Sequence, residues 1–218
     1  MTEGQQEGSE TRRRRPRWMT LFAVLLLLLG GRFLVTSLSD LHRLVTGKTE
    51  VLRLDGSLDV QQEVLLRAQV VFANALGRDH PAALAVSAVA RFGLGLLYLF
   101  AVAALFAGDA RGRQASLLAG WAGIAVSLGN ALLLTTVVRG MLPALLPGLA
   151  EAFAQDAARA GRPLLDAGAV AAQAKLFLVD VPLAVTGMGV LWSLLVIAYF
   201  RGRSVRLFYN QAKRADHD

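Results

Sequence analysis

Long apolar stretches alternate with polar connections along the chain. Four stretches of 19 to 24 residues carry at most one charged residue each, and they lie at 18–38, 86–107, 115–138 and 182–200. About 20 helical residues cross the roughly 30 Å of hydrocarbon in a bilayer. A buried helix of a water-soluble protein rarely stays apolar on all sides for that length. The pattern therefore predicts an all-α integral membrane protein with four transmembrane helices between residues 18 and 200.

The connections after the first and third spans, 39–85 and 139–181, predict short extracytoplasmic amphipathic helices. In the first connection, apolar residues recur at helical spacing from 58 to 76. Asp55-Gly56 before them favours a hairpin or a turn into that helix. In the second connection, 140–149 is apolar with two prolines, as a re-entrant or interfacial stretch would be, and Ala-rich helical segments follow it at 149–160 and 164–178.

The first apolar stretch raises the question of a cleavable signal peptide, because five arginines precede it. Signal peptides have an apolar region of about 7–15 residues that ends in small residues at the cleavage site. Here the apolar run extends from Trp18 to Leu38, and no Ala-x-Ala follows it. We interpret the run as an uncleaved membrane anchor, preceded by a disordered basic tail at 1–17.

The basic residues indicate how the chain crosses the membrane. Twelve Lys and Arg fall in the N-terminal tail, the 108–114 turn and the basic C-terminal tail at 201–218, which all lie on one side of a four-pass chain. The other side holds nine, together with ten acidic residues. This positive-inside pattern predicts that both termini are cytoplasmic. Basic flanks also favour anionic lipid headgroups as partners.

Composition narrows the class of protein further. The net charge is +7, but no basic surface interleaved with aromatic residues is present, so we expect no nucleic-acid binding. The chain has no cysteine, which excludes disulfides, thiolate metal sites and cysteine nucleophiles. The excess of Arg over Lys, with abundant Ala, Gly and Leu, is typical of a GC-rich bacterial genome. The predicted location is a bacterial inner membrane.

Charged groups inside a span are expensive and are functional candidates. Arg32 lies fourteen residues beyond Trp18, about 21 Å into the first span, and Arg91 has a similar depth in the second. Both are interpreted as interface anchors. The alternative pairs them with an acidic residue (Asp40, Asp79 or Asp180) to form a cationic pocket for an anionic headgroup or substrate.

The third span is the most polar of the four. Asn130 is the only carboxamide within a span, and small residues recur every four positions at Ala119, Gly123, Ser127, Ala131 and Thr135. Small residues let helix backbones approach closely in lipid. We expect a helix-packing role, with Asn130 hydrogen-bonded to a neighbouring helix. The alternative is a substrate path lined by these groups.

Evidence for catalysis or metal binding is weak. His42 and His80, beside Asp40 and Asp79, are weak candidates for a zinc site, since their spacing follows no fixed motif. No phosphate-binding loop, nucleophile elbow or His-Glu-x-x-His motif is present. The sequence therefore predicts neither a catalytic residue nor a cofactor, and an enzyme is not favoured.

These features favour a non-enzymatic subunit or assembly partner of a larger bacterial inner-membrane complex, which contacts other membrane proteins or a second copy of itself. A small-solute carrier or channel component that uses Asn130 and the arginines is the first alternative. A sensor of the envelope or of lipid state is the second.

Overall fold

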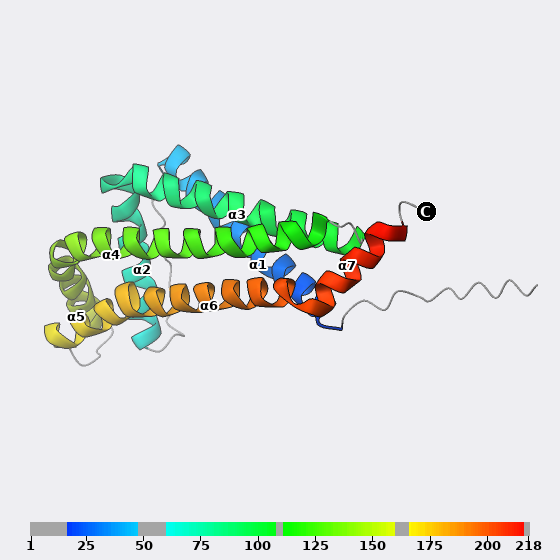
Figure 1. Cartoon of the computed structure of the whole chain (residues 1–218). Helices are drawn as coiled ribbons and strands as arrows, with labels where there is room; N and C mark the ends of the chain where they lie inside the picture. The colour runs from blue at the N-terminus through cyan, green and yellow to red at the C-terminus, as the bar shows by residue number, and fades with distance from the viewer. Residues whose placement is uncertain (1–16, 48–59, 108–110, 160–165, 216–218) are drawn as a thin grey trace, which may run out of the picture.

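The computed structural model describes residues 17–47, 60–107, 111–159 and 166–215, and within these ranges the chain is helical (Figure 1). The elements follow one another along the chain as α1 (Arg17–Thr46), α2 (Val60–Asp79), α3 (Pro81–Ala107), α4 (Arg111–Arg159), α5 (Ala167–Lys175), the π-helical η1 (Leu176–Asp180), α6 (Val181–Arg201) and α7 (Arg203–Ala215).

Within these described ranges, four helical segments are long and apolar enough to cross a membrane, namely Trp18–Thr46, Pro81–Ala107, Arg111–Gly148 and Gly168–Arg201. Each contains one of the apolar stretches found in the sequence. The prediction of an all-α, multi-pass protein with four membrane-spanning helices is therefore confirmed.

The four spanning helices pack as a row. α1 packs along α3, α3 along α4, and α4 along α6 (Figure 1). The two ends of the row, α1 and α6, meet through aromatic side chains: Phe22 of α1 stacks on Tyr199 and Trp192 of α6, with ring centroids 4.4 and 5.4 Å apart. These three rings pack on one core cluster, which also contains Val205 and Tyr209 of α7. The two outer helices of the row are therefore in contact at this end.

Glycines bring the spanning helices together. A Cβ atom built on Gly30 of α1 would lie 3.1 Å from the carbonyl oxygen of Gly95 in α3, and one on Gly95 would lie 3.0 Å from the carbonyl oxygen of Gly30. Between α4 and α6, a Cβ on Gly123 would lie 2.5 Å from Ser193 Oγ. Lipid supplies no hydrophobic drive between helices, so such close backbone contacts supply much of the packing energy.

The end of the row away from α7, here called the α2 end, is covered by α2, α5 and η1 (Figure 1). A second core cluster lies there, in which Phe72 of α2 packs against Val138 and Leu178. Both connections thus contain helices in the structure. Their amphipathic character stays a prediction, and the Asp55-Gly56 turn and residues 1–16 lie outside the described residues.

Helix α4 differs from the pattern expected for 140–149. It continues through Pro143 and Pro147 to Arg159, and Figure 1 shows it bending at the α2 end. Proline removes one backbone hydrogen bond and crowds the preceding turn, which bends a helix without always ending it. The π-helical turn η1 precedes Pro182 for a related reason, since Pro182 has no N–H to offer the turn before it.

The basic segment after α6 contains a further helix, α7. Gly202 adopts an extended ψ of 150° and separates α6 from α7. Val205 and Tyr209 of α7 are 0% and 4% exposed and belong to the main core cluster. The spacing of these two residues, one helical turn apart, was the available sequence signal. The end of the bundle that carries α7 is called the α7 end below.

Candidate functional site

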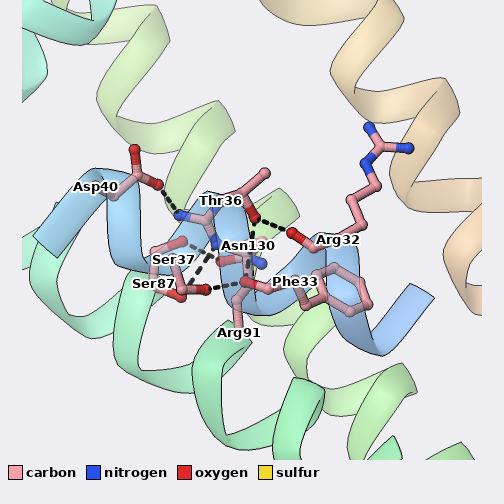
Figure 2. Close-up of polar contacts among 8 residues, drawn as sticks. All are labelled: Arg32, Phe33, Thr36, Ser37, Asp40, Ser87, Arg91 and Asn130. Atoms are coloured by element: carbon pink, nitrogen blue, oxygen red, sulfur yellow. Dashed lines mark hydrogen bonds and ion pairs between the residues drawn. The ribbon is translucent and has the colours of Figure 1, made fainter. Parts of the chain in front are cut away.

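An ion pair joins α1 and α3 inside the bundle (Figure 2). Arg91 Nη2 donates to Asp40 Oδ2 at 2.6 Å, and the two side chains are only 21% and 19% exposed. Arg91 lies sixteen residues before the end of α3 at Ala107, about 24 Å from the α7 end. The pair therefore sits in the half of the spans nearer α2, where a lone charge would be costly.

Local contacts orient the arginine toward its partner. Arg91 Nε donates to the carbonyl oxygen of Ser87, one turn earlier in α3, at 3.2 Å. This contact uses one of the five guanidinium N–H groups and turns the terminal nitrogens toward α1. On α1, Thr36 and Ser37 donate their hydroxyls to carbonyl oxygens of their own helix. Asp40 accepts its hydrogen bond from the Arg91 guanidinium.

A second hydrogen bond joins α3 to α4 in the same region. Ser87 Oγ donates to Asn130 Oδ1 at 2.7 Å (Figure 2). Ser87 therefore touches both interactions, through its carbonyl with Arg91 and through its hydroxyl with Asn130. The four residues, called the polar cluster below (Asp40, Ser87, Arg91 and Asn130), connect three neighbouring spans. These residues bond to one another and so hold α1, α3 and α4 together.

Arg32 is separate from this cluster. Figure 2 shows its side chain pointing away from Asp40 and Arg91. The side chain is exposed, and among the described residues it has no ion-pair or hydrogen-bond partner. Its neighbours on the same face, Leu28 and Val35, are 63% and 69% exposed. The two arginines, similar in the sequence, thus have different surroundings.

The small residues of α4 face two neighbours. Ala119 is fully buried. Gly123 contacts Ser193 of α6 and Tyr98 of α3, and Ser127 Oγ lies 3.0 Å from the position of a Cβ on Gly189. Close α4–α6 packing therefore runs along the first part of the stripe, whereas Asn130 turns to α3.

The two candidate zinc ligands are exposed: His42 lies on α1 and His80 lies between α2 and α3. The carboxylates beside them bind arginines instead. Asp40 pairs with Arg91, and Asp79 accepts hydrogen bonds from Arg78, which lower the pKa of the Asp79 carboxyl. Within the described ranges, no group of three or more His, Cys, Asp or Glu residues is placed to hold a metal ion.

The Ser87–Asn130 bond gives a first test of the cluster. We expect Asn130→Ala to lower the free energy of unfolding in bilayer-mimetic micelles by about 0.6 kcal/mol and by no more than about 1.7 kcal/mol, the average and the maximum measured for hydrogen bonds between membrane helices. Ser87→Ala should cost a similar amount, and the double variant little more than either single one. Additive losses in the two single variants would show that the side chains are not coupled.

No protein-family model, curated protein or solved structure matches the chain.

Proposed function

We propose that the protein is a non-enzymatic subunit or assembly partner of a larger complex in a bacterial inner membrane, with both termini in the cytoplasm. In this proposal its partner is another membrane protein, which docks on the exposed face of α1 through an acidic residue in one of its own spans. The observation that carries the proposal is Arg32, an exposed charge within a span whose described surroundings hold no counter-ion.

The cost of a bare charge in lipid supports a partner. Insertion measurements put an arginine at the centre of a spanning helix at about 2.5–3.5 kcal/mol unfavourable, and charged residues in spans usually pair or line a polar cavity. Arg91 follows this rule within the chain by pairing with Asp40. Arg32 has no such neighbour in the described ranges, so a carboxylate from a second span would supply the missing interaction.

The surroundings of Arg32 suit a helix partner. Exposed apolar side chains follow α1 at intervals of three or four residues on the same side as Arg32; they are Leu21, Val24, Leu28 and Val35. That spacing is the stripe by which one helix packs along another. A parallel pair of identical α1 helices would place two Arg32 side chains against each other, which disfavours a second copy of the chain on this face.

Co-isolation with a matched pair of variants tests the proposal. The tagged protein is purified from its native membrane in mild detergent, as wild type, as Arg32→Leu and as Arg78→Gln, which removes an exposed arginine of α2. We expect a stoichiometric membrane partner with wild type and Arg78→Gln, and its loss with Arg32→Leu. Arg32→Glu should regain the partner when the partner's acidic residue is changed to arginine.

Two results would contradict this function. Purification as a lone monomer with nothing co-isolating would argue against a complex. Full retention of the partner by Arg32→Leu would exclude the proposed role of Arg32.

A carrier or channel component is the second candidate, favoured by the presence of Asp40, Arg91 and Asn130 inside the bundle. Exchange of the two charges, by Asp40→Arg with Arg91→Asp, separates the candidates. The exchanged pair keeps an ion pair between α1 and α3, but it reverses the positions of the positive and negative charge that a solute would meet. Restored stability with lost uptake of an anionic solute would favour transport.

A further inference from the structure

Arginines from two helices converge on the end of α6. Arg113 of α4 donates from Nε to the carbonyl oxygen of Phe200 at 2.9 Å, and Arg206 of α7 donates from Nε to the carbonyl oxygen of Arg201 at 2.8 Å. The two acceptors are consecutive carbonyls of the last turn of α6, whose dipole favours cations. Each bond fixes a guanidinium and engages its Nε, while the terminal nitrogens carry further donors.

Two more arginines lie at the same junction. The guanidinium carbon of Arg201 lies 5.7 Å from the ring centre of Trp121, a cation–π distance. Arg203 begins α7 and its side chain is exposed. The first N–H groups of α4 and α7 also start here, and helix N-termini favour anions. The junction therefore gathers positive charge from side chains and from backbone.

No carboxylate neutralises this charge in the part of the α7 end that the structure describes. Residues 17–25, 98–107, 111–119 and 196–215 contain no Asp or Glu. A group of arginines with no carboxylate among these described residues, two of them held by hydrogen bonds, fits a phosphate, because arginine offers paired N–H donors that match phosphate oxygens.

Apolar anchors place the cluster at a membrane surface. Val205 and Tyr209 hold α7 against the core, while Leu207 is 50% exposed. Trp18, the second residue of α1, is 63% exposed at the same end. Exposed tryptophans favour the headgroup level of a bilayer. A helix with an apolar face and a basic face lies in that same plane.

We infer that the junction of α4, α6 and α7 is a binding site for the phosphate headgroup of an anionic membrane lipid, with Arg113, Arg201, Arg203 and Arg206 as its donors. The lipid lies in the leaflet at the α7 end, with its phosphate among the guanidiniums and its acyl chains along the spans. This site is at the opposite end of the bundle from the polar cluster and does not depend on the protein partner proposed for Arg32.

Lipid titration of the purified chain tests the inference. The protein in dodecyl maltoside is titrated with fluorescent phosphatidylglycerol and, separately, with fluorescent phosphatidylcholine, and energy transfer from its tryptophans reports binding. We expect wild type to prefer phosphatidylglycerol. Arg203→Gln with Arg206→Gln should weaken phosphatidylglycerol binding about tenfold or more, since each arginine near an anionic surface contributes about a factor of five.

Controls separate the site from general effects. Arg78→Gln at the α2 end should bind phosphatidylglycerol as wild type does, and phosphatidylcholine binding should be the same in all variants. The single variant Arg203→Gln, which leaves the Arg206 bond to α6 intact, should lose about half of the effect on a logarithmic scale. Circular dichroism in neutral micelles checks that every variant is folded.

Three outcomes would overturn the inference. They are equal affinity of wild type for the two lipids, unchanged phosphatidylglycerol binding by the folded double variant, and displacement of the lipid by inorganic phosphate at millimolar concentration. The last would assign the site to a free anion instead of a lipid.

Discussion

Asp40→Ala is expected to lower the free energy of unfolding by about 3 kcal/mol, the largest loss for a single substitution in the spans. The variant leaves the Arg91 guanidinium unpaired in a position that is only 21% exposed, and removal of one partner of a buried ion pair typically costs about 3–5 kcal/mol. The lower bound applies because both side chains keep some exposure. Unfolding by titration of a denaturing detergent into bicelles measures the loss.

The same pair offers an internal control. Arg91→Leu should cost less than Asp40→Ala, because it removes the charge that lies deeper in the spans. The double variant Asp40→Ala with Arg91→Leu should recover part of the loss, with a coupling energy of about 1.5 kcal/mol or more. A loss of under about 0.5 kcal/mol for Asp40→Ala would mean that Arg91 bonds to water or to another acceptor. The ion pair would then contribute little to the free energy of unfolding.

Gly95→Leu is expected to separate α1 from α3 and to cost about 2–3 kcal/mol. A Cβ at this position lies 3.0 Å from the backbone oxygen of Gly30 and from Leu34 Cγ, and a backbone atom cannot turn aside as a side chain can. Overpacking of a well-packed interface costs about 1–3 kcal/mol in general. The comparison with Gly93→Leu makes the measurement specific, because a Cβ on Gly93 meets nothing within 4 Å.

The two glycine variants share helix, residue type and added volume, so differences in helix propensity or insertion cancel between them. Equal stability of Gly93→Leu and Gly95→Leu, in the same detergent titration, would refute the close α1–α3 crossing.

Much of this fold follows from the sequence because hydrocarbon imposes simple rules. A segment with one charge in 22 residues, such as 86–107, has few alternatives to a spanning helix. The ends of the helices were less predictable. Pro143 and Pro147 indicated a re-entrant or interfacial stretch, and in the structure α4 continues through both prolines to Arg159.

Sequence reasoning found Asp40, Arg91 and Asn130, but it missed Ser87 and did not predict which of these residues pair. Asp40, Asp79 and Asp180 were equal candidates for Arg91, because the sequence does not say how far one helix slides along another. The Gly30–Gly95 contact sets that register, and from it Asp40 comes within reach of Arg91 while Asp79 binds Arg78. Arg32 and Arg91 have similar depths, and only the rotation of α1 about its axis separates their surroundings.

The basic C-terminal segment shows a different limit. The sequence identifies it only as a basic tail, because the apolar positions Val205, Phe208 and Tyr209 are too few to mark a helix by themselves. The segment is helical because the end of the bundle offers an apolar surface on which these side chains pack. Val205 and Tyr209 belong to the same core cluster as Phe200. Tertiary contact decided the structure there, as it commonly does for short helices.

The separation of 51 positions between Asp40 and Arg91 has a consequence for biosynthesis. At about 5–20 residues per second, the ribosome needs roughly 3–10 s to make the arginine after the aspartate. During that interval α1 stands in the bilayer before its neighbour exists. Asp40 is about 33 Å from Trp18, at the far edge of the hydrocarbon, where water can solvate it until α3 arrives. The Asp40–Arg91 ion pair can therefore form only once α3 has entered the bilayer beside α1.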